Sequence, residues 1–182
     1  MYEIRIHGLG GEGVVRMSEI IGQATMESGA WAHSFPFFGT EIRGAAVKAF
    51  TRVDDKPITI RSYIYEPDVL VLTNDVLLDN PDVTAGIKPE TIFVVATKTP
   101  REELEKKFGC TVYTIDAIDI AYEVIGRPIV NTIVLGALIG ATGIISLEAA
   151  EDSIRKSFPP KIADKNITAL HRGYDEIKKG VA

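Results

Sequence analysis

The sequence contains a single cysteine, Cys110, among its 182 residues. One thiol cannot form a disulfide within the chain. One thiolate also cannot hold an iron–sulfur cluster or a structural zinc ion, because both need several ligands. The three histidines, His7, His33 and His171, lack the spacing of a metal site. The sequence therefore predicts that this chain alone holds no metal centre.

Long apolar runs and a basic excess are also missing. The longest apolar stretch, 129–145, is interrupted by Asn131, Thr132 and Thr142 and falls short of the ~20 residues that a bilayer requires. The N-terminal residues do not show the basic and then apolar pattern of a signal peptide. The net charge is −5 and the basic residues are scattered, which disfavours nucleic acid. We therefore expect a cytoplasmic protein with neither a membrane nor a nucleic-acid partner.

The composition that remains is typical of a folded protein. Apolar residues make up 46% of the chain and charged residues 25%, well away from the composition of disordered chains. A chain of this length fits one domain, 1–182, with a large core.

The hydrophobic pattern predicts an α/β fold. An alternating strand precedes a glycine cluster and a helical pattern, which Gly29 is expected to end. Later β-branched runs are typical of central parallel strands, and from Ala117 onward the pattern is helical. We expect a three-layer α/β/α domain with a mostly parallel sheet and a helical C-terminal third. The predicted strands cover 2–7, 68–74, 91–97 and 111–116, and the first helix covers 14–28.

Local signals predict further details. The segment 30–44, rich in aromatic residues, Gly and Pro, suggests a long structured loop. The alternating runs 45–53 and 57–64 suggest a β-hairpin that turns at Asp54-Asp55. Asn131-Thr132 and Ser146 are expected to cap helices, and Cys110 to start a strand.

The glycine cluster Gly8-Leu9-Gly10-Gly11-Glu12-Gly13 satisfies the pattern G-x-G-x-x-G between a strand and a helix. A dinucleotide site needs an acidic residue about 20 positions further on, where this chain has Trp31-Ala32-His33-Ser34. Glu12 would also oppose a phosphate unless it points away. Three interpretations stay open: a structural turn or subunit contact, an anion or cofactor edge formed by Gly8, Gly10, Gly11 and Gly13, or an NAD or FAD site.

A second candidate site is an aromatic segment that also carries a carboxylate and a guanidinium. Aromatic and arginine side chains are enriched at protein interfaces. Alternatively, the segment folds over its own sheet edge, with Glu41 and Arg43 as a local ion pair. The candidate interface residues are Phe35, Pro36, Phe37, Phe38, Gly39, Glu41 and Arg43.

Three blocks together carry a family resemblance: HGLGGEGVV from His7, FPFFGTEIRGAAVKAFTRVDDKPI from Phe35, and YEPDVLVL from Tyr65. They resemble the gamma subunit of pyruvate:ferredoxin oxidoreductases, also called pyruvate synthases, in order and spacing through about Leu78. The remainder is compatible in length and pattern. The chain is thus identified as a member of the 2-oxoacid:ferredoxin oxidoreductase gamma family.

The resemblance implies a subunit without catalytic residues of its own. It implies an enzyme that oxidatively decarboxylates a 2-oxoacid to an acyl-CoA, with thiamine diphosphate between alpha and beta chains. It assigns the [4Fe–4S] clusters to beta and delta chains, which pass electrons to ferredoxin. The expected role is therefore structural, at an interface, and the isolated chain should be inactive.

Two positions depart from the family pattern. Family members usually carry Gln in place of Glu12 and often Arg in place of Ile42. Both changes disfavour direct contact with the phosphates of coenzyme A. They leave other 2-oxoacids open, namely oxalate, 2-oxoisovalerate and 2-oxoglutarate. A free-standing dinucleotide-binding oxidoreductase and a stand-alone ligand-binding module are the alternatives from other classes.

Overall fold

The computed structural model describes residues 1–37 and 45–181 and is built on a six-stranded sheet. The strand order is β2-β3-β1-β4-β5-β6. β1, β4, β5 and β6 are parallel, whereas β3 runs antiparallel to both β1 and β2. The predicted mostly parallel sheet is confirmed. The strands are β1 (Tyr2–Leu9), β2 (Trp31–Phe37), β3 (Ala46–Asp54), β4 (Val69–Leu72), β5 (Ile92–Ala96) and β6 (Thr111–Ile115).

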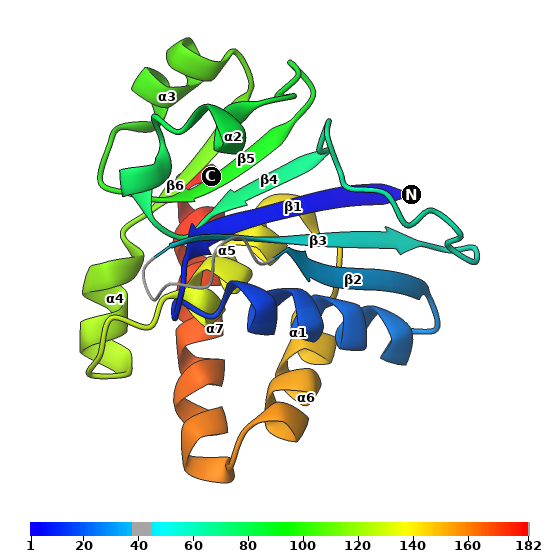
Figure 1. Cartoon of the computed structure of the whole chain (residues 1–182). Helices are drawn as coiled ribbons and strands as arrows, with labels where there is room; N and C mark the ends of the chain where they lie inside the picture. The colour runs from blue at the N-terminus through cyan, green and yellow to red at the C-terminus, as the bar shows by residue number, and fades with distance from the viewer. Residues whose placement is uncertain (38–44, 182) are drawn as a thin grey trace.

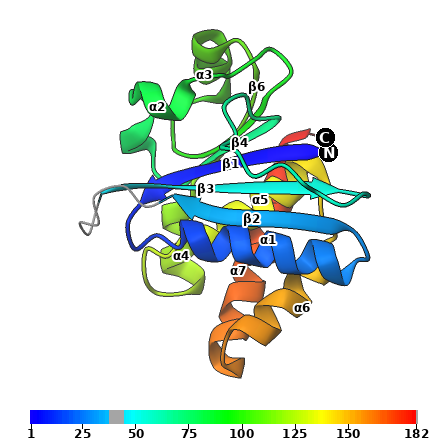
Figure 2. The ribbon, with the colours of Figure 1, turned by 45° about the vertical axis from the view of Figure 1, so that its right-hand side comes forward.

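Helices cover both faces of the sheet (Figures 1 and 2). On one face lie the short helices that follow β4 and the helix between β5 and β6. On the other face, α1, α5 and α7 pack against the sheet, and α6 contacts α1 and α7. The helices are α1 (Val14–Glu27), η1 (Asp75–Leu77), α2 (Pro81–Thr84), α3 (Arg101–Phe108), α4 (Ala117–Val124), α5 (Asn131–Thr142), α6 (Leu147–Ser157) and α7 (Pro160–Val181).

Each face of the sheet has its own hydrophobic core. The larger core contains Ile4 and Ile6 of β1 and the inner sides of α1, α5 and α7. The smaller core contains Leu70, Leu72 and Phe93 together with Leu104 of α3. β4 is buried along its whole length because its alternate residues enter different cores. This explains why its sequence is continuously apolar.

The prediction that residues 30–44 form a loop was wrong for residues 31–37. Trp31–Phe37 form β2, the edge strand, which pairs with β3. Ser34 points toward α1, where its hydroxyl donates to the carbonyl of Ser18 at 3.1 Å. Phe35 points to the opposite face and packs against Phe50 with the two rings tilted by 32°. The alternation is therefore present, and Pro36 is tolerated because the strand lies at an edge.

The prediction that residues 57–64 pair with β3 in a hairpin was also wrong. Residues 57–64 form neither helix nor strand, and the antiparallel partner of β3 next to it in the chain is β2. β3 has β1 on its other side, so no edge remains for the second run. Asp54-Asp55 consequently end a strand instead of turning a hairpin.

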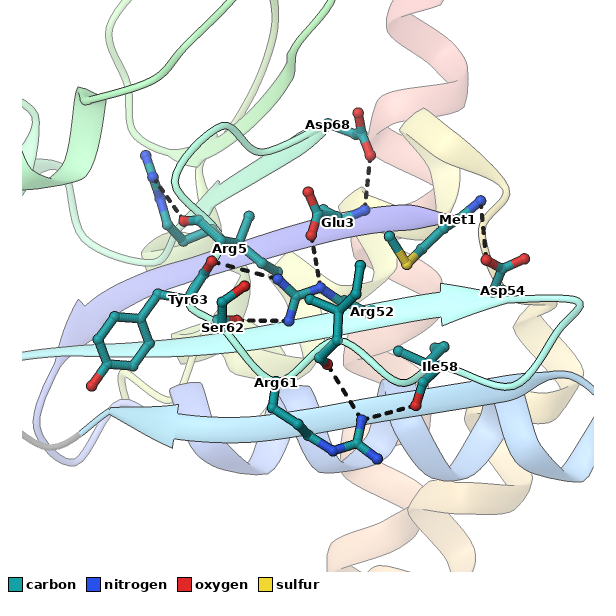
Figure 3. A network of polar contacts seen from close by, with 12 residues as sticks. Met1, Glu3, Arg5, Arg52, Asp54, Ile58, Arg61, Ser62, Tyr63 and Asp68 are labelled. Atoms are coloured by element: carbon teal, nitrogen blue, oxygen red, sulfur yellow. Dashed lines mark hydrogen bonds and ion pairs between the residues drawn. The ribbon is translucent and has the colours of Figure 1, made fainter.

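Two buried arginines hold this segment, which we call the strap (residues 55–66), against the sheet (Figure 3). Arg52 donates to the carbonyl of Ser62 at 2.8 Å and to the Glu3 carboxylate at 2.7 Å. Arg5 donates to the carbonyls of Ile64 and Tyr65. The carbonyl groups of the strap thus accept hydrogen bonds from arginine side chains instead of from a neighbouring strand. The alternating pattern of the sequence does not reveal this difference.

The predicted helix ends were partly correct. Gly29 follows α1 with a positive φ of 82°, and Ser146 caps α6 by accepting the Ala149 N–H at 3.1 Å. Asn131 was expected to cap α5 but is its first residue, and α5 has no side-chain cap. Asn131 is instead buried beside Gly13, because the helix begins against the glycine turn.

α5 and α7 cross with their backbones in contact. A Cβ atom at Gly136 would lie 1.9 Å from the carbonyl oxygen of Leu170, and a Cβ at Gly173 would lie 1.9 Å from that of Ile133. Only glycine fits either position. This crossing joins the C-terminal helix to the larger core.

Candidate functional site

The predicted glycine motif connects β1 to α1 at the carboxyl edge of the parallel strands. Gly11 and Gly13 have φ angles of 97° and 81°, which glycine adopts without strain. The Gly10 N–H donates to the carbonyl of Ala45 at 2.8 Å, so the turn is tied to the start of β3. The motif therefore lies where ligands bind in open α/β sheets.

The Glu12 side chain folds back into the turn. Its carboxylate accepts the Leu9 N–H at 2.8 Å, the Thr73 hydroxyl at 2.8 Å and the Asn74 amide at 2.6 Å. Thr73 and Asn74 directly follow β4. The carboxylate thus joins the ends of β1 and β4 and accepts hydrogen bonds as a bound anion would.

The four glycines differ in their surroundings. A Cβ at Gly8 would lie 2.0 Å from the Thr73 hydroxyl oxygen, and one at Gly13 would lie 2.5 Å from the Asn131 amide nitrogen. A Cβ at Gly11 would meet no described atom within 4 Å. Gly8 and Gly13 are therefore required by packing, whereas no packing among the described residues requires Gly11. Cofactor binding by Gly8, Gly10, Gly11 and Gly13 stays a prediction.

Removal of the Glu12 carboxylate tests its role in the turn. We expect Glu12→Ala to lower the free energy of unfolding by about 2 kcal/mol, because the Leu9 N–H and the Thr73 hydroxyl lose their acceptor. Glu12→Gln keeps one carbonyl oxygen and should cost about half as much. Chemical denaturation of both variants measures this. Equal stabilities of the wild type and Glu12→Ala would contradict the proposed tie between β1 and β4.

A cavity of about 330 Å³ lies next to this turn. Lys98 forms ion pairs with Asp119 at 2.7 Å and with Asp116 at 3.0 Å, and these two carboxylates raise the pKa of Lys98. Asp75 accepts the Thr97 hydroxyl at 2.9 Å. The sequence analysis missed these residues, although polar residues directly after buried strands mark the functional edge of such sheets. The cavity is lined by Thr73, Asn74, Asp75, Ala96, Thr97, Lys98, Asp116, Ala117, Ile118 and Asp119.

His7 lies one residue before the glycine turn and is buried. Its pKa is lowered to about 3, mainly by burial and to a smaller extent by the positive charges of Arg5 and Lys48. The imidazole is therefore neutral at physiological pH. His7 is part of the packed interior and not an exposed acid or base.

Part of the aromatic candidate segment belongs to an aromatic face on the β2–β3 hairpin. Phe50 and Tyr63 stack at 5.2 Å, and Phe35 contacts both, with ring centroids at 5.1 and 6.2 Å. Phe37 meets Tyr63 edge-on at 5.3 Å. Tyr65, next along the strap, is largely exposed. Phe35, Pro36 and Phe37 are therefore part of the edge strand itself, and the role of the segment at an interface stays a prediction. The candidates Phe38, Gly39, Glu41 and Arg43, together with Ile42, lie outside the described residues.

The described part of the chain shows neither a cluster of metal ligands nor a helix that could cross a membrane. Within residues 1–37 and 45–181, no group of three or more His, Cys, Asp or Glu side chains is placed to hold a metal ion. In the same ranges, every helix is too short or too polar to cross a membrane.

Comparison with known proteins decides the family. Residues 3–176 match the family model described as pyruvate ferredoxin/flavodoxin oxidoreductase. The chain belongs to this family. The resemblance seen in the first half of the sequence therefore extends over nearly the whole chain, and the predicted family is confirmed.

Individual members of this oxidoreductase family support the assignment along the full length. The common gamma subunit of pyruvate/ketoisovalerate oxidoreductases from Thermococcus kodakarensis is 45% identical over 97% of both chains. Pyruvate synthase subunit PorC from Methanothermobacter thermautotrophicus is 44% identical over 98% of this chain and 97% of that protein. The crystal structure of pyruvate oxidoreductase subunit PORC from Thermotoga maritima has a TM-score of 0.85 at 38% identity, covering 96% and 95% of the two chains. The predicted fold class is also confirmed.

Proposed function

We propose that this chain is the gamma subunit of a cytoplasmic pyruvate:ferredoxin oxidoreductase. The observation that carries the proposal is the identity of about 45% with gamma-type subunits, which extends over almost the complete length of both chains. The complex would convert pyruvate and coenzyme A to acetyl-CoA and carbon dioxide, with two electrons passing to ferredoxin. Alpha, beta and delta subunits would be the partners.

The cofactors of this reaction would be held by the assembled complex. Thiamine diphosphate would supply the chemistry that removes carbon dioxide from the 2-oxoacid, and [4Fe–4S] clusters would carry the electrons. Within this division of labour, the gamma chain positions its partners. The glycine turn would face the cleft between subunits, and the segment 35–44 would contact a partner chain.

The choice of 2-oxoacid is the finer part of the proposal. We propose pyruvate, because both relatives from archaea have pyruvate in their names. The Thermococcus protein is named as a subunit common to pyruvate and ketoisovalerate enzymes, which favours 2-oxoisovalerate as a second substrate. A shared gamma subunit is physically reasonable where the substrate pocket is formed by other chains.

The experiment is purification of the tagged chain from its native source under anaerobic conditions. We expect larger subunits that contain thiamine and iron–sulfur clusters to co-purify in fixed stoichiometry. The complex should reduce ferredoxin only with both a 2-oxoacid and coenzyme A, and pyruvate, 2-oxoisovalerate and 2-oxoglutarate are compared in parallel. The isolated chain serves as the control. Turnover by that chain alone, or a native chain that purifies without partners, would refute the proposal.

A further inference from the structure

We propose that the cavity edge is a docking surface that receives a lysine or arginine side chain from a partner subunit. The cavity edge consists of the cavity lining around Asp75 and Lys98 together with the adjoining side chains of Val76, Ile118 and Tyr122. The inference rests on the proposed function because it assumes that the chain works in a complex. It goes further by naming a surface and the chemistry of its occupant.

Apolar side chains at the cavity edge point into solvent. Val76, which follows Asp75, is 77% exposed, and Ile118 and Tyr122 of α4 are 43% and 57% exposed. Ile118 lines the cavity, and Tyr122 lies one helical turn further along the same face of α4. Ile120 and Ala121 of the same helix are buried in the larger core. The outer face of α4 is therefore apolar at two successive turns without covering the interior.

The charge of the cavity selects the kind of partner. Its lining contains the carboxylates of Asp75, Asp116 and Asp119 but only one cation, Lys98. Lys98 pairs with Asp116 and Asp119, and among the described residues the side chain of Asp75 is bonded only to the Thr97 hydroxyl. The lining thus has a formal charge of about −2 at neutral pH. A basic side chain complements this charge, whereas a phosphate or carboxylate would be repelled.

The geometry favours a protein segment as the occupant. Lys98 pairs with both Asp116 and Asp119, and among the described residues no three carboxylates converge on one point as metal ligands would. The exposed apolar side chains of Val76, Ile118 and Tyr122 belong to the same two helices as Asp75 and Asp119. This combination matches an interface in which a basic residue is flanked by apolar contacts. The glycine turn borders the same edge, because Glu12 contacts Asn74 at 2.6 Å. The docking surface therefore continues onto the turn.

The test measures the affinity of this chain for the separately purified complex of its partner subunits, by calorimetry or biolayer interferometry at low and high salt. We expect Asp75→Lys to weaken binding at least about tenfold at low salt, because it places a like charge against the incoming residue. Asp75→Asn should weaken binding less and reduce the salt dependence. Ile118→Ser should also weaken binding, with little change in the salt dependence, because it removes an apolar contact and leaves the charge of the surface unchanged.

Asp164→Lys is the matched control. Asp164 is an exposed residue of α7, so the same charge change should leave the affinity unaltered. Thermal melts of every variant must match the wild type before its affinity is interpreted, and Asp75→Asn serves if Asp75→Lys does not fold. If wild type binds its partners and the Asp75 and Ile118 variants bind equally well, the docking surface is wrong. If wild type binds no such subunits, the proposed function itself fails.

Discussion

Gly136→Ala is expected to destabilise the protein by about 3–5 kcal/mol, a large fraction of the stability of a typical domain. The added Cβ would lie 1.9 Å from the carbonyl oxygen of Leu170, which belongs to the backbone of α7 and cannot rotate away. The two helices would have to separate, and the contacts of the larger core around Leu170 would loosen. Chemical denaturation followed by circular dichroism measures the loss.

The reciprocal glycine gives a sharper form of this prediction. Gly173→Ala alone should cost a similar amount, because its Cβ would meet the carbonyl oxygen of Ile133. In the double variant the helices are already separated, so the total loss should be smaller than the sum by at least about 1 kcal/mol. Gly180→Ala is the control on the same helix, since its Cβ would meet no described atom within 4 Å. Losses that add, or a Gly180 variant as unstable as the others, would contradict the close crossing.

Arg5→Met is expected to lower the free energy of unfolding by about 3–5 kcal/mol and to release the strap from the sheet. Arg5 is 4% exposed and donates to four backbone carbonyls, those of Ile64, Tyr65, Val83 and Ala85. Methionine fills similar space but leaves these carbonyls without their donor. Burial already lowers the pKa of Arg5, so its charge is tolerated only because these acceptors surround it.

The measurement combines global unfolding with limited proteolysis of the strap. We expect cleavage within 55–66 to become faster for Arg5→Met, because the strap opens locally. Arg5→Lys should be intermediate, since an ammonium group has three donors and lacks the planar fork. Arg61→Met is the matched control. Arg61 is exposed and, among the described residues, bonds only carbonyls within the strap, so its loss should stay within about 0.5 kcal/mol. If the Arg5 and Arg61 variants are equally stable, the strap is not held by Arg5.

The parallel half of the fold could be predicted from sequence because each of its elements is encoded locally. β4 and β5 are short and entirely apolar, Gly29 ends α1, and Ser146 caps α6. The antiparallel half depends on contacts distant in the chain. Residues 57–64 have a strand pattern, but Arg5 and Arg52 donate to the carbonyls of Ile64 and Ser62 from strands 59 and 10 positions away. The strand propensity of residues 57–64 was therefore overridden by hydrogen bonds to residues distant in the chain.

The candidate site was predictable in position more than in detail. The glycine motif marked the carboxyl edge correctly, and the missing ribose carboxylate cast doubt on a dinucleotide. The inward turn of Glu12 could not be foreseen, because its partners Thr73 and Asn74 are 61 and 62 residues away. The cavity residues Lys98 and Asp116 were missed for the same reason: each follows a different strand, and only the sheet brings them together.

The surroundings of the lone thiol have a practical consequence. Cys110 lies directly before β6, is 7% exposed, and has its pKa raised to about 11 by burial and by the nearby charge of Glu105. At neutral pH only about one molecule in ten thousand carries a thiolate there, and oxidants and alkylating reagents attack the thiolate. We therefore expect the purified subunit to form few disulfide-linked pairs in air. An engineered surface cysteine can be labelled in it selectively with the natural one left in place.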